Sequence, residues 1–157
     1  MRSQYIEKNS GHKDSFQVGL EYQDFVFEQL ARQLGMVFTP YTSYSYQKDK
    51  GESLQGVEIK LDARMVETKQ LSIEVAEKSK EGNYEFIPSG IYCEDNTWLY
   101  VQGNYDVIFI FCKKYLRRLH QSGKYQEHEL PTIKKFYLPI DHAFKICTKV
   151  IKPLKLS

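Results

Sequence analysis

Charged and apolar residues alternate in two segments of this chain, Gly56–Asp62 and Leu71–Lys78. A β-strand places successive side chains on opposite faces, so each segment is expected to form a strand with one apolar face and one charged face. If the two strands form an antiparallel hairpin centred near Val66, Glu58 lies opposite Glu74. Their Cβ atoms would then be about 5 Å apart.

Two carboxylates at that separation repel each other unless a cation lies between them. Lys60 shares a strand face with Glu58, and Lys78 shares one with Glu74. A divalent metal ion would compensate the two acids more strongly, because Mg²⁺ prefers oxygen ligands. Paired carboxylates beside a lysine are the groups that metal-assisted phosphodiester cleavage requires. The alternative is structural: the same acids line the solvent side of a half-exposed hairpin and pair with Lys60 and Lys78.

Composition indicates a globular protein with a core of its own. The 157 residues are 41% apolar and 27% charged, which fits one domain. The net charge is only +2, so overall basicity does not predict a nucleic-acid partner. Any such surface must come from local clusters of charge.

Three widely spaced cysteines, Cys93, Cys112 and Cys147, include no CxxC pair. They are expected to be reduced thiols rather than zinc ligands. The N-terminal sequence lacks the apolar region of a signal peptide, and no apolar run is long enough to span a bilayer. We therefore expect a cytoplasmic protein without a membrane partner.

The pattern along the chain predicts alternating helices and strands. Residues 1–14 are polar and expected to be frayed. The elements expected after them are a helix over 15–34 ended by Gly35, an extended segment over 36–46, a charged loop over 47–55, the hairpin, a turn over 79–85, a segment over 87–92 leading toward a strand, strands over 97–101, 107–111 and 135–140, and helices over 113–121 and 141–151. The strand over 107–111 is apolar throughout, which is typical of burial on both faces. This order predicts an α/β fold with a mixed central β-sheet flanked by helices.

Residues 15–121 resemble the PD-(D/E)XK nuclease superfamily in the order of their elements and in their acidic residues. The resemblance implies a restriction-endonuclease-like core and a metal-dependent endonuclease that cleaves DNA. It implies that Glu21, in the first helix, joins Glu58 and Glu74 as ligands of Mg²⁺, with Mn²⁺ as the alternative ion. It also implies a catalytic lysine close to these acids.

The chain departs from the family motif at that lysine, because Ala76 stands two residues after Glu74. Lys60 or Lys78 would then supply the amine. In a second register, Glu58-Ile59-Lys60 is itself the (D/E)xK element, and Asp49 or Glu52 is the upstream acid. We prefer the first assignment, in which Glu58 and Glu74 are the paired acids, because these two residues are expected to converge across the hairpin.

A nucleic-acid surface is predicted on the helix over 113–121 and on the preceding extended segment. The basic residues Lys113, Lys114, Arg117 and Arg118 could contact phosphates, and Tyr44 and Tyr46 could stack on bases. A solvated helix face and sheet packing are the structural alternatives.

The leading functional hypothesis is a Mg²⁺-dependent DNA endonuclease. Symmetric cleavage of duplex DNA would favour a homodimer. The alternative is a non-catalytic nucleic-acid-binding or assembly module that retains the nuclease fold, which the missing lysine after Glu74 favours.

Overall fold

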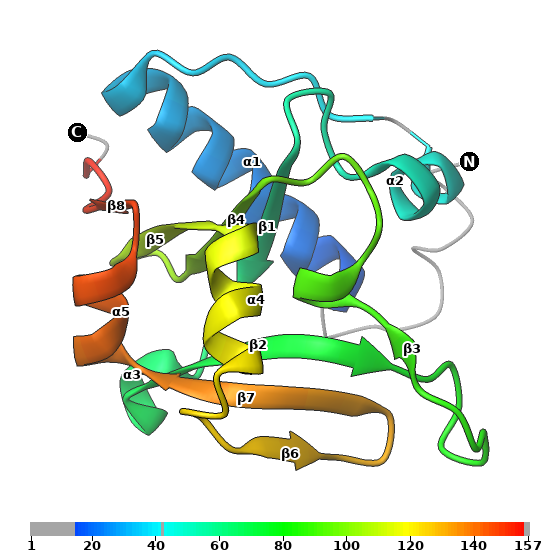
Figure 1. The fold of residues 1–157 in the computed structure, drawn as a ribbon. Helices are drawn as coiled ribbons and strands as arrows, with labels where there is room; N and C mark the ends of the chain where they lie inside the picture. Colours follow the sequence, from blue (N-terminus) through cyan, green and yellow to red (C-terminus); the bar gives the residue numbers. More distant parts are fainter. Residues whose placement is uncertain (1–14, 42, 156–157) are drawn as a thin grey trace, which may run out of the picture.

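The protein is a mixed α/β structure with two four-stranded sheets (Figure 1). The computed structural model describes residues 15–41 and 43–155, so the expected fraying of residues 1–14 lies outside the described part. The helices are α1 (Ser15–Leu34), α2 (Tyr44–Lys50), α3 (Met65–Thr68), α4 (Lys113–Gln121), α5 (Ile140–Ile146) and the 3₁₀ helix η1 (Gly90–Tyr92). The strands are β1 (Val57–Leu61), β2 (Gln70–Glu77), β3 (Ile87–Pro88), β4 (Leu99–Gly103), β5 (Ile108–Cys112), β6 (Glu127–Glu129), β7 (Ile133–Pro139) and β8 (Lys149–Ile151).

Helix α1 has the predicted bounds and packs on the first sheet. Its buried residues Tyr22, Val26 and Leu30 recur every fourth position, which places them on one face. Gly35 follows in the left-handed region, at φ 65°, and its N–H donates to the carbonyl of Ala31.

The first sheet has the strand order β1-β4-β5-β8. Strand β1 pairs with β4 in parallel, with Glu58 beside Tyr100, and the other pairs are antiparallel. Apolar side chains from one face of this sheet pack against α1, and Phe109 and Phe111 of the other face belong to a second core. Burial of β5 on both faces confirms the prediction for residues 107–111.

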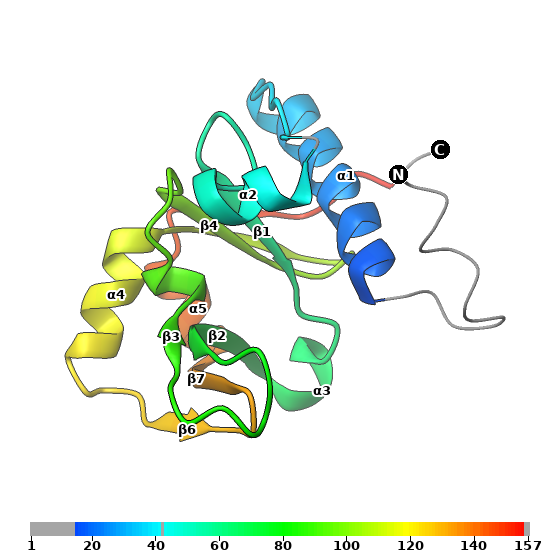
Figure 2. The ribbon, with the colours of Figure 1, turned by 90° about the vertical axis from the view of Figure 1, so that its right-hand side faces the viewer.

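The second sheet is antiparallel, with the order β3-β2-β7-β6. Leu71, Ile73 and Val75 of β2 pack with Phe136 of β7 and Leu116 of α4 in the second core. Figure 2 shows α1 and the first sheet above this second sheet, with α4 to one side.

The predicted hairpin between Gly56–Asp62 and Leu71–Lys78 is wrong, because β1 and β2 belong to different sheets. Residues 62–69 contain α3 and Lys69, which has a positive φ of 58°, so the chain is redirected instead of folding back. Strand β1 then takes β4 as its partner, and β2 takes β7 and β3. The single central sheet that we expected is accordingly two sheets, one mixed and one antiparallel.

Other boundaries also differ from the predictions. Residues 44–50, expected as extended chain and loop, form α2, whose first turn is capped by Ser43 accepting from the N–H of Tyr46. The last predicted helix ends at Ile146 and is followed by β8, and β6 was not predicted. Helix α4 has the predicted bounds.

One carboxylate connects the two sheets where β1 ends. Asp62 Oδ2 accepts from the backbone N–H of Ser72 at 2.8 Å and from Gln102 Nε2 at 2.9 Å. Gln102 Nε2 also donates to the carbonyl of Ser72. These bonds hold β2 of the second sheet against β1 and β4 of the first, although within residues 15–41 and 43–155 no strand ladder joins the two sheets.

Gly90 is expected to be essential for the packing of η1 on β2. Its φ is +52°, and an added Cβ would lie 2.4 Å from the carbonyl oxygen of Glu74. Gly123 also has a positive φ, +70°, but its Cβ would meet no atom within 4 Å. Gly123→Ala should therefore cost roughly 1 kcal/mol of unfolding free energy and Gly90→Ala roughly 3 kcal/mol. Urea unfolding of both variants measures this, and equal losses would contradict the close approach.

Candidate functional site

Glu58 is a buried carboxylate on β1, an edge strand of the first sheet. It lies on the face of β1 opposite the residues that pack on α1, and its side chain is 8% exposed. Glu58 Oε1 is 3.1 Å from Lys60 Nζ, whereas Oε2 is buried and has no hydrogen-bond partner. Buried polar atoms are normally bonded, so the unpaired oxygen requires an explanation.

Glu52 approaches the same lysine from the loop after α2. Glu52 Oε2 accepts from the backbone N–H of Ile59 at 3.0 Å and from Gln23 Nε2 of α1 at 3.4 Å. Lys60 Nζ lies 4.0 Å from Glu52 Oε1. The loop therefore runs along the free edge of β1 and fixes Glu52 beside Glu58 and Lys60. These contacts bring together Glu52, Glu58 and Lys60, three of the residues named in the second register.

Glu74, on β2 of the second sheet, interacts electrostatically with Lys60. Its Oε1 accepts from Ser89 Oγ at 2.6 Å, and Gly90 packs closely against its backbone. The charge of Glu74 acts on Lys60 and on the buried phenol of Tyr100. Glu58 and Glu74 therefore act on one lysine, although they do so from different sheets and not across a hairpin.

Two acids of this cluster, Glu58 and Glu52, are difficult to ionise, and Lys60 is difficult to neutralise. Burial raises the pKa of Glu58, and raises that of Glu52 to about 7, although Lys60 opposes both shifts. Burial alone would lower the pKa of Lys60, but the neighbouring acids, Glu58 first, hold it well above its ordinary value. Lys60 therefore stays positively charged, and its charge partly offsets the negative charges of the neighbouring carboxylates.

A second ion pair, between Lys113 and Asp95, lies near Glu58. Lys113 Nζ is 3.1 Å from Asp95 Oδ1, the two side chains are 3% and 7% exposed, and the ammonium also donates to the carbonyl of Cys93 at 2.8 Å. Burial would raise the pKa of Asp95, but hydrogen bonds from Thr97 and Lys113 hold it below its ordinary value. The positive charge of Lys113 also favours ionised Glu58.

The basic face of α4 is used largely inside the protein. Arg117 Nε donates to the carbonyl of Ile91, Arg117 Nη2 donates to that of Cys93 at 3.3 Å, and the guanidinium lies over the ring of Tyr92. Together with Lys113, Arg117 holds the η1 segment that packs on Glu74. Contrary to the expectation of phosphate contacts, Lys113 and Arg117 serve this internal role, and only Lys114 and Arg118 of the four are exposed.

The remaining predicted site residues lie elsewhere. Glu21 accepts from Gln17 within α1, whereas Gln23 is the α1 residue that donates to Glu52. Lys78 Nζ lies over the ring of Phe86, 4.6 Å from its centroid. Tyr44 lies in α2, and Tyr46 of the same helix is exposed and packs edge-on against Tyr41.

The carboxylates of the cluster suit a hard divalent cation in chemical type. Glu58, Glu52 and Glu74 provide only oxygen ligands, and Glu58 Oε2 is a buried oxygen without a partner. Among residues 15–41 and 43–155, no three His, Cys, Asp or Glu side chains are already grouped so as to hold a metal ion. The cation that now lies beside Glu58 and Glu52 is the Lys60 ammonium.

Comparison of the chain with protein-family models, with curated proteins and with solved structures found no match. Within the described part of the chain, no helix has the length and apolar character to cross a membrane.

Glu52 should make the protein less stable as the pH rises when no metal is present. Its folded-state pKa is about 7 against an ordinary 4.5, so between these values the folded state binds more protons than the unfolded state. The unfolding free energy should fall by roughly 3 kcal/mol from pH 4.5 to pH 8. Glu52→Gln should remove most of this fall. Urea unfolding in EDTA is the measurement.

The control is Glu67→Gln, because Glu67 is 72% exposed on α3. This variant should keep the parent's pH dependence. A Glu52→Gln protein with the same pH dependence as its parent would contradict the raised pKa.

Proposed function

We propose that this protein is a metal-dependent nuclease that hydrolyses phosphodiester bonds in DNA at the cluster of Glu52, Glu58, Lys60 and Glu74. The observation that carries this proposal is the buried Glu58 carboxylate, with one oxygen beside Lys60 and the other without a partner. A restriction-endonuclease-like core built around α1 and β1 is part of the same proposal.

A purely structural role does not account for Glu58. The solvent side of a half-exposed hairpin would leave its carboxylate hydrated, but the side chain is 8% exposed and no hairpin forms. Burying a carboxylate with an unbonded oxygen costs free energy. Perturbed, incompletely satisfied ionisable groups gather at functional sites, which supports a ligand-binding role.

Each residue has a separate chemical role in the proposed reaction. Glu58, Glu52 and Glu74 would hold Mg²⁺ or Mn²⁺ through carboxylate oxygens. The bound ion would polarise the phosphate and lower the pKa of a coordinated water. Lys60, whose pKa is held well above its ordinary value by the neighbouring acids, stays protonated and can donate to phosphate oxygens as negative charge develops there. Ser89 fixes the carboxylate of Glu74 by its hydrogen bond.

The second candidate function is a nucleic-acid-binding or assembly module without catalysis. The specific observation in its favour is that Lys60 already pairs with Glu58, and Ala76 replaces the family lysine after Glu74. Nicking activity separates the two functions.

Glu58→Gln should abolish cleavage while leaving the fold intact. The amide keeps the shape of the side chain but removes the charge that binds the cation, so nicking of supercoiled plasmid with Mg²⁺ or Mn²⁺ should fall by about a hundredfold or more. Glu77→Gln, three residues beyond Glu74 on β2, is the control and should nick like the parent. Equal nicking by the parent and Glu58→Gln would contradict the assignment of Glu58 to the catalytic site. A parent that nicks nothing with either ion would favour the non-catalytic binding or assembly module.

A further inference from the structure

The second sheet has a face that does not belong to its core. Phe136 and Leu138 of β7 point into the core, so Lys135 and Tyr137, which alternate with them, lie on the other face. The strand register places Glu74 of β2 beside Lys135, and Lys135 beside His128 of β6. A row of side chains therefore runs across three strands and begins at an acid of the proposed catalytic cluster.

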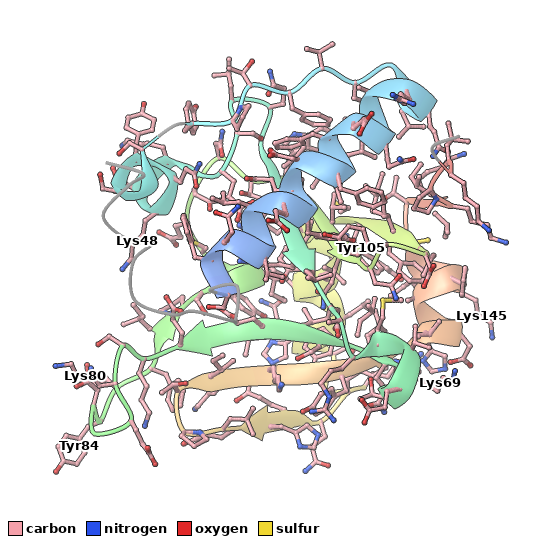
Figure 3. The ribbon with its side chains drawn as sticks, turned by 180° about the vertical axis from the view of Figure 1, so that it is seen from behind. Lys48, Lys69, Lys80, Tyr84, Tyr105 and Lys145 are labelled. Atoms are coloured by element: carbon pink, nitrogen blue, oxygen red, sulfur yellow. The ribbon has the colours of Figure 1, made fainter. Side chains whose placement is uncertain are left out.

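Figure 3 shows the molecule from the side of this face, with β2 and β7 across the lower half, β6 below them and α1 above. We call the outer face the surface formed by Glu74, Lys135, Tyr137 and His128. Helix α4 and η1 lie on the opposite side of the sheet (Figure 2).

Three side chains of the outer face contact one another around an aromatic ring. The ring of Tyr137 is 5.0 Å from that of His128, and Lys135 Nζ lies 5.1 Å from the centroid of the Tyr137 ring. All three side chains are partly exposed. Lys135 has no carboxylate within 4.0 Å among the described residues, so its charge is available to a ligand.

A partly exposed sheet face with an aromatic ring, and with a lysine that has no carboxylate partner among the described residues, matches the chemistry of a nucleic-acid strand. Bases stack on aromatic rings in a sequence-tolerant way, and lysine neutralises phosphate. Adjacent strands are about 4.8 Å apart, so the row from Glu74 to His128 covers roughly 10 Å, the rise of about three nucleotides. Stacking on Tyr137 requires a base whose face is free, which favours an unpaired strand over a duplex.

We infer that the outer face binds one unpaired nucleic-acid strand, with a base on Tyr137 and a phosphate on Lys135, and leads that strand to Glu74. This inference rests on the proposed function for the identity of the substrate, but binding can be measured without cleavage. The surface replaces α4 as the main nucleic-acid interface, because Lys113 and Arg117 are used internally.

Fluorescence anisotropy of a labelled 12-nucleotide single strand, in EDTA to prevent cleavage, tests the inference. The single strand should bind more tightly than a blunt duplex of the same sequence. Tyr137→Leu should weaken single-strand binding about tenfold, the scale of one base–aromatic contact. Lys135→Gln should reduce the slope of log affinity against log salt by about 0.7, one phosphate contact.

Matched controls come from other surfaces of the protein. Tyr115→Leu changes a tyrosine on α4 that is 42% exposed, and Lys145→Gln changes an exposed lysine on α5. Both should bind like the parent. Thermal melting should show that Tyr137→Leu folds, and Lys135→Gln tests the surface without altering the ring.

The outcomes separate this inference from the proposed function. If the parent nicks plasmid but the Tyr137→Leu and Lys135→Gln variants bind the single strand normally, the inference about the outer face is overturned and the proposed function is not. A preference for duplex over single strand has the same consequence. A parent that binds the single strand through these residues but cleaves nothing with Mg²⁺ or Mn²⁺ supports the outer face and overturns the nuclease. A parent that binds no nucleic acid overturns both.

Discussion

The ion pair between buried Glu58 and Lys60 is the constraint on which the rest of the site depends. A carboxylate that is 8% exposed cannot rely on water to stabilise its charge, so the protein must supply a cation. Lys60 supplies one directly, and Lys113 adds a second favourable charge that its partner Asp95 partly offsets. Because Lys60 also interacts with Glu52 and Glu74, one ammonium compensates acids from a loop and from both sheets. Glu58 Oε2 has no hydrogen-bond partner among the described residues. This unpaired oxygen makes the cluster a candidate for binding a divalent ion, because a purely structural network would be expected to satisfy all of its buried oxygens.

The fold positions these acids through side-chain bonds more than through strand pairing. The loop before β1 lies along the free edge of that strand because Glu52 accepts from the N–H of Ile59. The second sheet is held to the first by Asp62, which accepts from Ser72 and Gln102. Helix α4 then holds η1 through Lys113 and Arg117, and η1 supports Glu74 through Ser89 and Gly90. This sequence of contacts explains why a helix face that looks like a phosphate-binding patch is committed to internal carbonyl groups.

The sequence predicted the features that depend on local pattern. The bounds of α1 and α4 and the burial of β5 follow from helical periodicity, glycine signals and a continuous apolar run. The proximity of Glu58 and Lys60 also follows, because residues two apart in a strand share a face.

The pairing of the strands could not be predicted, since alternation shows which residues share a face but not which strand lies alongside. The connector over 62–69 forms α3, and this alone invalidates the hairpin. Asp95 was missed because its partner Lys113 is eighteen residues away with no motif between them. Arg117 looked solvated because its acceptors are backbone carbonyls, which sequence does not distinguish.

The Mn²⁺ affinity of Lys60→Met, compared with that of the parent at pH 8, tests most directly whether this lysine and a divalent ion compensate the same carboxylates. Removing the ammonium leaves Glu58 and Glu52 without their nearest cation, and it removes a positive charge that repels the metal. Isothermal titration calorimetry should therefore show Mn²⁺ binding about tenfold or more tighter, the effect of one nearby unit charge in a partly screened site, and Mn²⁺ should restore thermal stability that the variant loses in EDTA. Unchanged or weaker Mn²⁺ binding by Lys60→Met would contradict a metal site formed by Glu58 and Glu52.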